Sequence, residues 1–385
     1  MIYHVTSNFS RPGGNPGPTE VIRQLTKYLT DRGRHTTVLA ADKAETAVTR
    51  GVDLVEFPLQ PWGRIWRYPQ GFSNYLEKIT RGSQSLLHIH EIWLAPQWLA
   101  ARIARRNRVP AILTSHGEYS TWHWRDGSLR RIKKLAYWFT LASPAFRHLS
   151  VFHAITPEER DDLHRHFPQG RFEVIPNAID LEEADLLLAQ AELESPPPLD
   201  KPYLLFVGRL HPKKGVKVLI QAFAQSIRGR DFRLAIVGPG DSAYPSYPAE
   251  LTSLVHSLGL ETRVSFLGAV YGPRKWRLYR DAWAFCAPSH SEVVGLVNLE
   301  AAAAATPGVT THETGLFDWE EGGGILVHAK VAEVAEALDR VFAWRESERD
   351  DRGRSLRQLV ERRYSWETIG PRWLSLYDDL LEKYR

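Results

Sequence analysis

The chain has 385 residues, 43% of them hydrophobic and 24% charged, which is an ordinary composition for a soluble globular protein but too long for one core. Its net charge of +4 suits a small anionic ligand or an anionic surface and does not require nucleic acid, so no nucleic-acid partner is expected. A single cysteine, Cys286, excludes an intrachain disulfide framework and fits a reducing compartment. Neither a secretion signal nor an apolar run of about 20 residues is found, so we expect a cytoplasmic protein.

The first half of the chain alternates short apolar runs with helix-like stretches. Ile22, Leu25 and Leu29 recur at helical spacing within 20–33. Strands are expected at 2–7, 36–41, 54–58, 85–90, 111–116 and 152–156, and a further helix at 128–142. This alternation predicts a parallel sheet covered by helices on both faces, in a domain spanning 1–178.

The same pattern restarts after a proline-rich linker expected at 179–202. Strands of the second domain, 203–364, are expected at 203–210, 232–240, 264–270, 283–289 and 324–327. A last amphipathic helix is expected over 365–385. The predicted fold class is α/β, with two doubly wound, Rossmann-like parallel-sheet domains.

A glycine-rich loop follows the first predicted strand. Gly13 and Gly14 would let the backbone approach a ligand closely, and the helix that follows favours an anion at its start. A plain turn is an equally good interpretation. The Gly-x-Gly-x-x-Gly fingerprint is missing, which argues against a nicotinamide-dependent oxidoreductase.

Two cations follow the strand that ends near Gly208. Arg209 offers a fork for phosphate oxygens, and Lys214 offers a mobile point charge. Both are expected at the carboxyl edge of the second sheet, where ligands bind in such folds. Taken alone, the loop would more often be a solvated basic loop.

Two acids, Glu292 and Glu300, flank the start of a predicted helix. The amides of Gly295, Leu296 and Val297 begin that helix and can receive phosphate or sugar oxygens. Each carboxylate suits a vicinal diol, because it can accept two hydroxyl hydrogen bonds. The alternative is that Glu292 stabilises the helix dipole and Glu300 is a surface acid.

Histidines end two of the predicted strands of the first domain. His88 and His90 lie on one face of their strand, and His116 ends another strand. A zinc site is conceivable, but these positions form no compact ligand pattern. Histidines that pack or face the substrate are favoured, and no metal site is predicted.

The predicted helix at 128–141 carries Arg130, Arg131, Lys133 and Lys134 beside an apolar face with Tyr137, Trp138 and Phe139. Such a helix can rest on an anionic membrane that carries a lipid-linked acceptor, which would place the protein at the inner face of the cell membrane. The alternative is an ordinary surface helix whose apolar face covers the sheet.

The ordered set of motifs resembles the retaining glycosyltransferases of family 4, which have the GT-B fold. The resemblance rests on Gly208-Arg209-Leu210 with Lys214-Gly215, and on Glu292 and Glu300 placed as in that family's Glu-x7-Glu motif. Further landmarks agree in order, namely Gly13-Gly14, Ser115-His116-Gly117, 174–180 and 266–268. The sequence differs from that family's pattern at Val294, Ala305 and Gly315. These differences affect the expected donor sugar more than the expected reaction class.

The resemblance implies a donor site in the second domain. Arg209 and Lys214 would neutralise the donor diphosphate, Glu292 would hold hydroxyls of the transferred sugar, and Glu300 would bind the ribose. The amides of Gly295, Leu296 and Val297 would contact sugar and phosphate, and Val270 would line the base.

The resemblance also places His116 near the transferred sugar and Gly13 and Gly14 near its phosphate, and it implies that the final helix returns to the acceptor-binding first domain. The expected catalytic residues are thus His116, Arg209, Lys214 and Glu292. No cofactor is expected, and the missing Asp-x-Asp pair fits metal independence.

The expected activity is transfer of a hexose from a UDP- or GDP-linked sugar, with retention, to a saccharide or a polyprenyl-linked oligosaccharide in bacterial cell-surface polysaccharide synthesis. Two alternatives stay open: a nucleotide-sugar 2-epimerase of similar architecture, and a non-catalytic nucleotide-sugar-binding protein.

Overall fold

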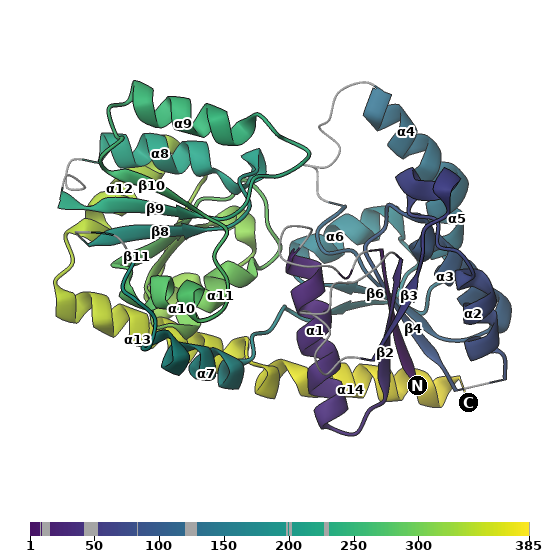
Figure 1. Ribbon diagram of the computed structural model, residues 1–385. Coiled ribbons are helices and arrows are strands. Elements are labelled where there is room, and N and C mark those ends of the chain that lie inside the picture. Colours follow the sequence, from purple (N-terminus) through teal and green to yellow (C-terminus); the bar gives the residue numbers. More distant parts are fainter. Residues whose placement is uncertain are drawn as a thin grey trace. The chain divides into compact units, whose positions relative to one another are not determined.

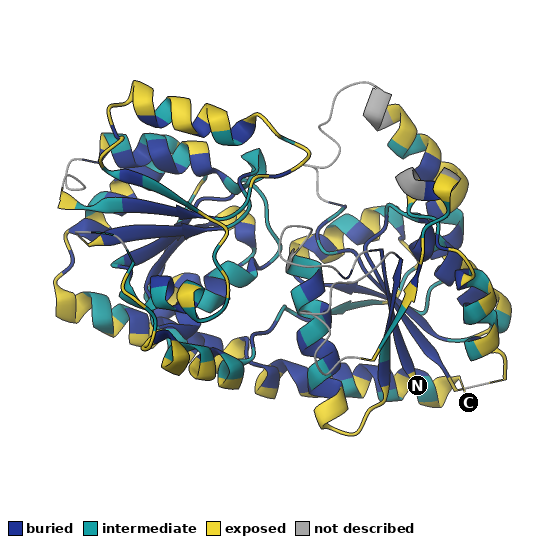
Figure 2. Cartoon of the chain, in the orientation of Figure 1, coloured by how far each residue is buried: buried dark blue, intermediate teal, exposed yellow. Residues whose placement is uncertain are grey.

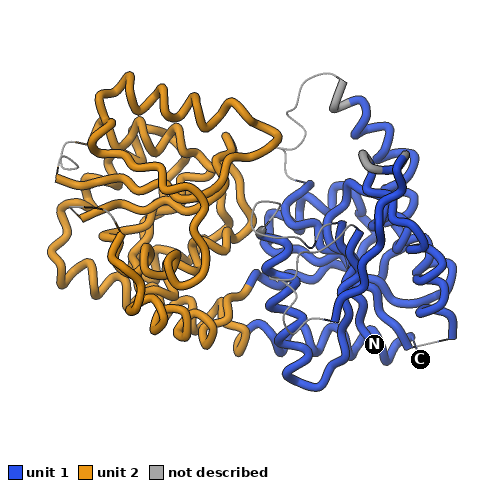
Figure 3. The backbone as a smooth tube through the Cα atoms, in the orientation of Figure 1, with its two compact units in different colours: residues 1–177, 369–385 blue, residues 178–368 orange. Residues whose placement is uncertain are grey.

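The computed structural model describes residues 1–7, 9, 16–41, 53–82, 84–119, 129–197, 199, 202–226 and 231–384. They form two compact units (Figure 3). Unit 1 comprises Met1–Asn177 and Ile369–Arg385, and unit 2 comprises Ala178–Thr368. Each unit is a parallel sheet covered by helices, so the expected pair of doubly wound α/β domains is confirmed (Figure 1).

The sheet of unit 1 has seven strands in the order β3-β2-β1-β4-β5-β6-β7, all paired in parallel. The strands are β1 Ile2–Thr6, β2 Thr36–Ala41, β3 Leu54–Phe57, β4 Leu86–His90, β5 Ala111–Thr114, β6 Val151–Ala154 and β7 Phe172–Val174. The sequence had predicted all of them except β7. The strand order reverses between β1 and β4, and ligands bind parallel sheets of this kind at the carboxyl ends of such strands.

Helices cover both faces of this sheet. They are α1 Pro16–Asp31, α2 Phe72–Thr80, α3 Ala95–Asn107, α4 Leu129–Tyr137, α5 Ser143–Phe146 and α6 Pro157–His166. Apolar residues of α1 meet the sheet as their spacing predicts, because Ile22, Leu25 and Leu29 are all buried. The helix expected at 128–142 is α4, followed by one π-helical turn at Trp138–Ala142.

The sheet of unit 2 has six parallel strands in the order β10-β9-β8-β11-β12-β13. They are β8 Tyr203–Val207, β9 Arg233–Val237, β10 Val264–Gly268, β11 Ala284–Ala287, β12 Gly308–Thr311 and β13 Ile325–Val327. The sequence reasoning missed β12. The order reverses between β8 and β11, so the loops after these two strands lie where a ligand is expected.

The helices of unit 2 are α7 Leu181–Ala191, α8 Val216–Gln225, α9 Tyr247–Ser257, α10 Gly272–Asp281, α11 Leu296–Ala303, α12 Val331–Phe342 and α13 Glu346–Arg363. Helix α11 ends earlier than its alanine run, because Ala305 adopts a left-handed φ of 53°. Glycine would take this conformation without strain, whereas a residue with a Cβ adopts it only at an energetic cost.

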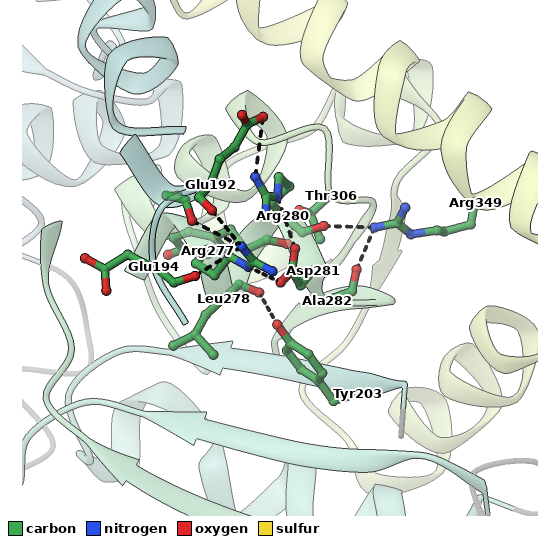
Figure 4. Close-up of polar contacts among 12 residues, drawn as sticks. Glu192, Glu194, Tyr203, Arg277, Leu278, Arg280, Asp281, Ala282, Thr306 and Arg349 are labelled. Atoms are coloured by element: carbon green, nitrogen blue, oxygen red, sulfur yellow. Dashed lines mark hydrogen bonds and ion pairs between the residues drawn. The ribbon is translucent and has the colours of Figure 1, made fainter. Parts of the chain in front are cut away.

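The segment 179–202, expected as a linker, lies instead within unit 2, because its helix α7 packs against α10. The guanidinium of Arg277 on α10 donates to the carbonyls of Ala191 and Glu194, each at 3.3 Å, at the end of α7 (Figure 4). Arg349 donates to the carbonyl of Ala282 at 2.7 Å, just beyond α10. These contacts hold α10 in place, and α10 carries residues of the site described below.

The last helix, α14 Trp366–Lys383, starts in unit 2 and belongs to unit 1 from Ile369 onward. One stripe of α14 is buried in unit 1, at Trp373, Leu376, Tyr377 and Leu380 (Figure 2). Gly370 permits this packing, because a Cβ at this position would come within 1.9 Å of the Tyr28 ring.

Candidate active site

Arg209 extends from the loop after β8, at the carboxyl edge of the unit 2 sheet. Its Nη1 donates to Oδ2 of Asp241 at 2.8 Å, and the two side chains are 29% and 8% exposed. Asp241 follows β9, and its other oxygen accepts a hydrogen bond from the Ala243 amide at 2.9 Å. A partly exposed guanidinium is thus held in one orientation by a buried acid. The sequence analysis missed Asp241, although it follows Gly238-Pro239-Gly240 at the end of a predicted strand.

Lys214 lies in the short 3-10 helix Pro212–Lys214, and its Nζ donates to Oε2 of Glu292. The neighbouring Gly215 has a φ of 70°, and a Cβ there would lie 1.9 Å from the carbonyl oxygen of Pro288. Glycine is therefore needed to bring this loop against the loop that carries Glu292. The two predicted residues meet as an ion pair whose side chains are 20% and 17% exposed.

The charge state of Glu292 follows from its surroundings. Burial raises the pKa of this carboxyl, but the positive charges of Lys214, Lys213 and Arg209 outweigh burial and lower the pKa to about 2. Glu292 is therefore ionised at neutral pH. Arg209 and Lys214, on the loop after β8, therefore both act on the carboxylate of Glu292.

Backbone hydrogen bonds brace the Glu292 loop. The amides of Glu292 and Val294 donate to the carbonyls of Glu313 and Thr314, both at 2.9 Å. Val294 adopts a left-handed φ of 43°, and Gly295 then precedes the first turn of α11. The first-turn residues Leu296 and Val297 are half-buried, and first-turn amides have no hydrogen-bond partner within their own helix.

Glu300 lies farther along α11, and both of its oxygens have partners from α10. Lys275 Nζ donates to Oε1 at 2.7 Å, and the Tyr279 hydroxyl donates to Oε2 at 2.8 Å. Burial and the adjacent Glu300 raise the pKa of Tyr279 well above its usual range, so Tyr279 stays a donor. Sequence reasoning missed both partners, although their four-residue spacing places them on one face of a helix.

The remaining predicted residue of unit 2 is Val270, which is half-buried in the loop after β10. This loop also lies at the carboxyl edge of the sheet, because β10 runs parallel to β9 and β8. Unit 2 therefore gathers Arg209, Lys214, Glu292 and Glu300 at one edge of its sheet, with Val270 at the end of the outermost strand.

In unit 1, His116 is half-buried directly after β5 and has a left-handed φ of 52°. The carboxylate of Glu159 holds this loop, because its Oε1 accepts hydrogen bonds from the Ser115 hydroxyl and from the Gly117 amide at 2.6 Å. Its Oε2 accepts from the Ile155 amide at 2.7 Å. Sequence analysis gave no sign of Glu159. Gly13 and Gly14 lie outside the described residues.

His88 and His90 belong to a buried polar layer on one face of the unit 1 sheet. The ligand nitrogens of His4, His88 and His90 lie within 4.8 Å of one another, a separation that a metal ion could bridge. Both nitrogens of His88 already have hydrogen-bond partners, however: the Tyr377 hydroxyl and the Thr114 hydroxyl, each at 2.7 Å. These contacts agree with packed histidines.

The helix expected to contact a membrane presents a mixed surface. Ile132 and Phe139 are 62% and 69% exposed, and Lys133 is exposed beside them. Tyr137 and Trp138 are buried and belong to the core of unit 1, so they do not form part of an exposed apolar face. The side chains of Arg130 and Arg131 lie outside the described part of the structure.

The two units and their charged edges define the class of protein. Two α/β units with parallel sheets of seven and six strands are the architecture of the GT-B glycosyltransferases. A sucrose-phosphate synthase from Thermosynechococcus elongatus has a similar fold, with a TM-score of 0.73 and 22% identity over 100% of both chains. The Anabaena protein HepE, solved in complex with UDP and glucose, has a TM-score of 0.74 and 18% identity over 98% of this chain and 99% of its own.

Sequence comparisons identify the family. Residues 17–183 match glycosyltransferase family 4, and residues 191–355 match glycosyl transferases group 1. A D-inositol 3-phosphate glycosyltransferase from Corynebacterium glutamicum is 30% identical over 332 residues, which cover 79% of this chain and 74% of that protein. The chain therefore belongs to the group 1 glycosyltransferase family, and the expected family is confirmed.

The extent of the matches varies among the curated relatives. The matched region spans 56% of a Methanocaldococcus jannaschii glycosyltransferase and 48% of a D-inositol 3-phosphate glycosyltransferase from Nocardia farcinica. It spans 95% of the corresponding protein from Xylanimonas cellulosilytica, at 28% identity.

Within the described residues, no helix has the length and apolar character needed to cross a membrane.

Proposed function

We propose that this protein transfers a hexose from a UDP- or GDP-linked sugar to a saccharide or lipid-linked oligosaccharide, with retention of configuration at the transferred carbon. The observation that carries the proposal is the Lys214–Glu292 ion pair beside Arg209, at the start of α11. Two cations and the first-turn amides of a helix favour a diphosphate, whereas a charged carboxylate favours hydroxyl groups.

Each residue of unit 2 then has a role in binding the donor. Arg209 and Lys214 neutralise the diphosphate, and the amides of Gly295, Leu296 and Val297 contact sugar and phosphate oxygens. Glu292 accepts hydrogen bonds from hydroxyls of the transferred sugar. Glu300, held by Lys275 and Tyr279, accepts the two hydroxyls of the ribose. Val270 lines the base.

We propose roles for residues of unit 1 as well. His116 binds the transferred sugar, and Gly13 and Gly14 approach its phosphate. The acceptor binds to unit 1. Support for His116 comes from its half-buried position at the carboxyl edge of β5, on a loop that Glu159 fixes.

In the proposed reaction the bond between the anomeric carbon and the diphosphate oxygen breaks, and negative charge grows on the departing diphosphate. Arg209, Lys214 and the amides of α11 stabilise that charge without requiring a metal ion or another cofactor. The acceptor hydroxyl attacks on the face that the diphosphate leaves. Attack on that face retains the configuration, and the proton of the hydroxyl passes to the departing phosphate oxygen, so atoms and charges balance.

We place this activity in bacterial cell-surface polysaccharide synthesis, in the cytoplasm at the inner face of the cell membrane. One similar fold belongs to WaaG, a glycosyltransferase involved in lipopolysaccharide biosynthesis, with a TM-score of 0.69. Exposed Ile132 and Phe139 beside Lys133 support contact with an anionic membrane that carries a polyprenyl-linked acceptor.

The test measures thermal stabilisation by a panel of nucleotide sugars, together with the slow release of nucleoside diphosphate. We expect one donor to stabilise the protein and to be hydrolysed, and we expect Lys214→Ala and Glu292→Ala to abolish the release. Lys330→Ala is the matched control, because Lys330 forms an ion pair with Glu333 on the surface of the same unit. If no donor has an effect at millimolar concentration, or if the control loses as much activity, the proposed function is wrong.

A further inference from the structure

Three histidines of unit 1 form a continuous chain of hydrogen bonds. His4 Nδ1 lies 3.1 Å from His90 Nε2, and His90 Nδ1 lies 3.0 Å from His116 Nε2. His4 on β1 and His90 on β4 are 0% and 1% exposed, whereas His116 is half-buried. The chain therefore leads from a closed end inside the core to an end near the surface, at the carboxyl edge of the sheet.

This chain must be directional. Burial lowers the pKa of all three imidazoles, to about 3 for His4 and His116, so each ring is neutral at pH 7 and carries one N–H. Both nitrogens of His90 face another histidine, so His90 must donate to one neighbour and accept from the other. The N–H groups of the chain therefore all point toward His4 or all point toward His116.

The closed end decides between the two directions. Among the described residues, Nε2 of His4 is buried without a hydrogen-bond partner. If the chain pointed toward His4, this nitrogen would carry a proton and leave a buried N–H without an acceptor. The opposite direction leaves only an unused lone pair. Buried N–H groups without an acceptor are rarer in proteins than buried acceptors without a donor. The N–H groups of the chain are therefore expected to point toward His116.

We propose that His4 and His90 are positioning residues, which hold His116 with its proton on Nδ1 and make it a hydrogen-bond donor to the nucleotide sugar. His4 Nδ1–H donates to His90, His90 Nδ1–H donates to Nε2 of His116, and Nδ1–H of His116 points away from the chain. The identity of the ligand rests on the proposed function, whereas the tautomer does not. In this tautomer His116 donates a hydrogen bond to an oxygen of the nucleotide sugar and does not act as a general base.

The first test records the tautomers in the ligand-free full chain, labelled with ¹⁵N-histidine, by long-range ¹H–¹⁵N NMR. Signals are assigned by their loss in single variants. We expect the proton on Nδ1 of His4, His90 and His116; a proton on Nε2 of His116 would overturn the proposal. Because no nucleotide sugar is present, this result is independent of the proposed glycosyl transfer.

A variant of the chain tests the coupling. His90→Phe removes both hydrogen bonds of the middle ring, so the His116 signals should shift to those of a tautomer mixture. His153→Phe is the matched control: His153 is equally buried in the same layer, but it bonds to Thr114 and to the Ile175 carbonyl instead. If His116 responds equally to both variants, or to neither, His90 does not set its tautomer.

Substitution of His116 itself tests its donor role. Asn and Asp both tolerate its left-handed φ, but only Asn carries an N–H donor near the position of Nδ1. With UDP-glucose as the probe in titration calorimetry, we expect His116→Asn to bind within a few-fold of wild type. His116→Ala and His116→Asp should bind about tenfold more weakly or worse. The proposal is wrong if Asn binds no better than Ala. If the wild type itself does not bind this probe, the glycosyl-transfer proposal is weakened while the NMR result stands.

Discussion

Replacing Glu292 by Gln removes the negative charge of the Lys214–Glu292 ion pair and keeps the shape of the side chain. The folded protein lowers the pKa of Glu292 from 4.5 to about 2. At 1.36 kcal/mol for each pKa unit, this corresponds to about 3 kcal/mol of stability at neutral pH. Because the folded pKa is the lower one, this stabilisation is fully present above pH 4.5 and is lost as the pH falls toward 2.

The difference between the folded and unfolded pKa values of Glu292 gives the stability that is lost at each pH. Of the stability contributed by Glu292 at pH 7, about 1 kcal/mol should be lost at pH 4 and about 2 kcal/mol at pH 3. The Glu292→Gln variant has no carboxyl group at this position that could take up a proton. The difference in the free energy of unfolding between wild type and variant should therefore shrink by about 2 kcal/mol between pH 7 and pH 3.

Urea unfolding followed by tryptophan fluorescence and circular dichroism at a series of pH values measures this difference. Glu333→Gln is the control, because Glu333 forms its ion pair with Lys330 at the surface and should give no resolvable change of this kind. A difference between wild type and Glu292→Gln that stays constant from pH 7 to pH 3 would refute the assigned ion pair. The assigned ion pair would also be refuted if Glu292→Gln and Glu333→Gln showed the same change with pH.

Three further predictions concern other parts of the chain. Glu300→Ala should weaken UDP binding about tenfold in calorimetry and Tyr279→Phe should weaken it less, because Lys275 still holds the carboxylate; equal affinity in all three proteins would remove the ribose role. Gly215→Ala should lower the free energy of unfolding by more than about 1 kcal/mol in urea titrations, since its Cβ would meet the Pro288 carbonyl. Ile132→Asp with Phe139→Asp should reduce flotation with anionic vesicles, whereas Leu193→Asp, at a residue 90% exposed in unit 2, should not; unchanged flotation in both would favour an ordinary surface helix.

Short-range patterns in the sequence determined the architecture and the main charged residues of the candidate site. Apolar runs separated by helical spacing predicted the buried strands, because a parallel strand covered on both faces must be apolar along its length. The loops that carry Arg209, Lys214 and Glu292 were predicted because each directly follows such a strand. Two strands were missed because neither is an apolar run: β7 has Glu173 at its centre, and in β12 Val309 stands between a glycine and two threonines.

Only the tertiary structure decided which groups meet. Asp241 is 32 residues from Arg209, Glu292 is 78 residues from Lys214, and Lys275 is 25 residues from Glu300. Local propensity carries no information about such pairs, because the strand order of the sheet brings them together. The same reason explains why 179–202 joins unit 2, through the contacts of Arg277 with the end of α7. The buried chain from His4 to His116 likewise exists only because β1, β4 and β5 are neighbours in the folded sheet.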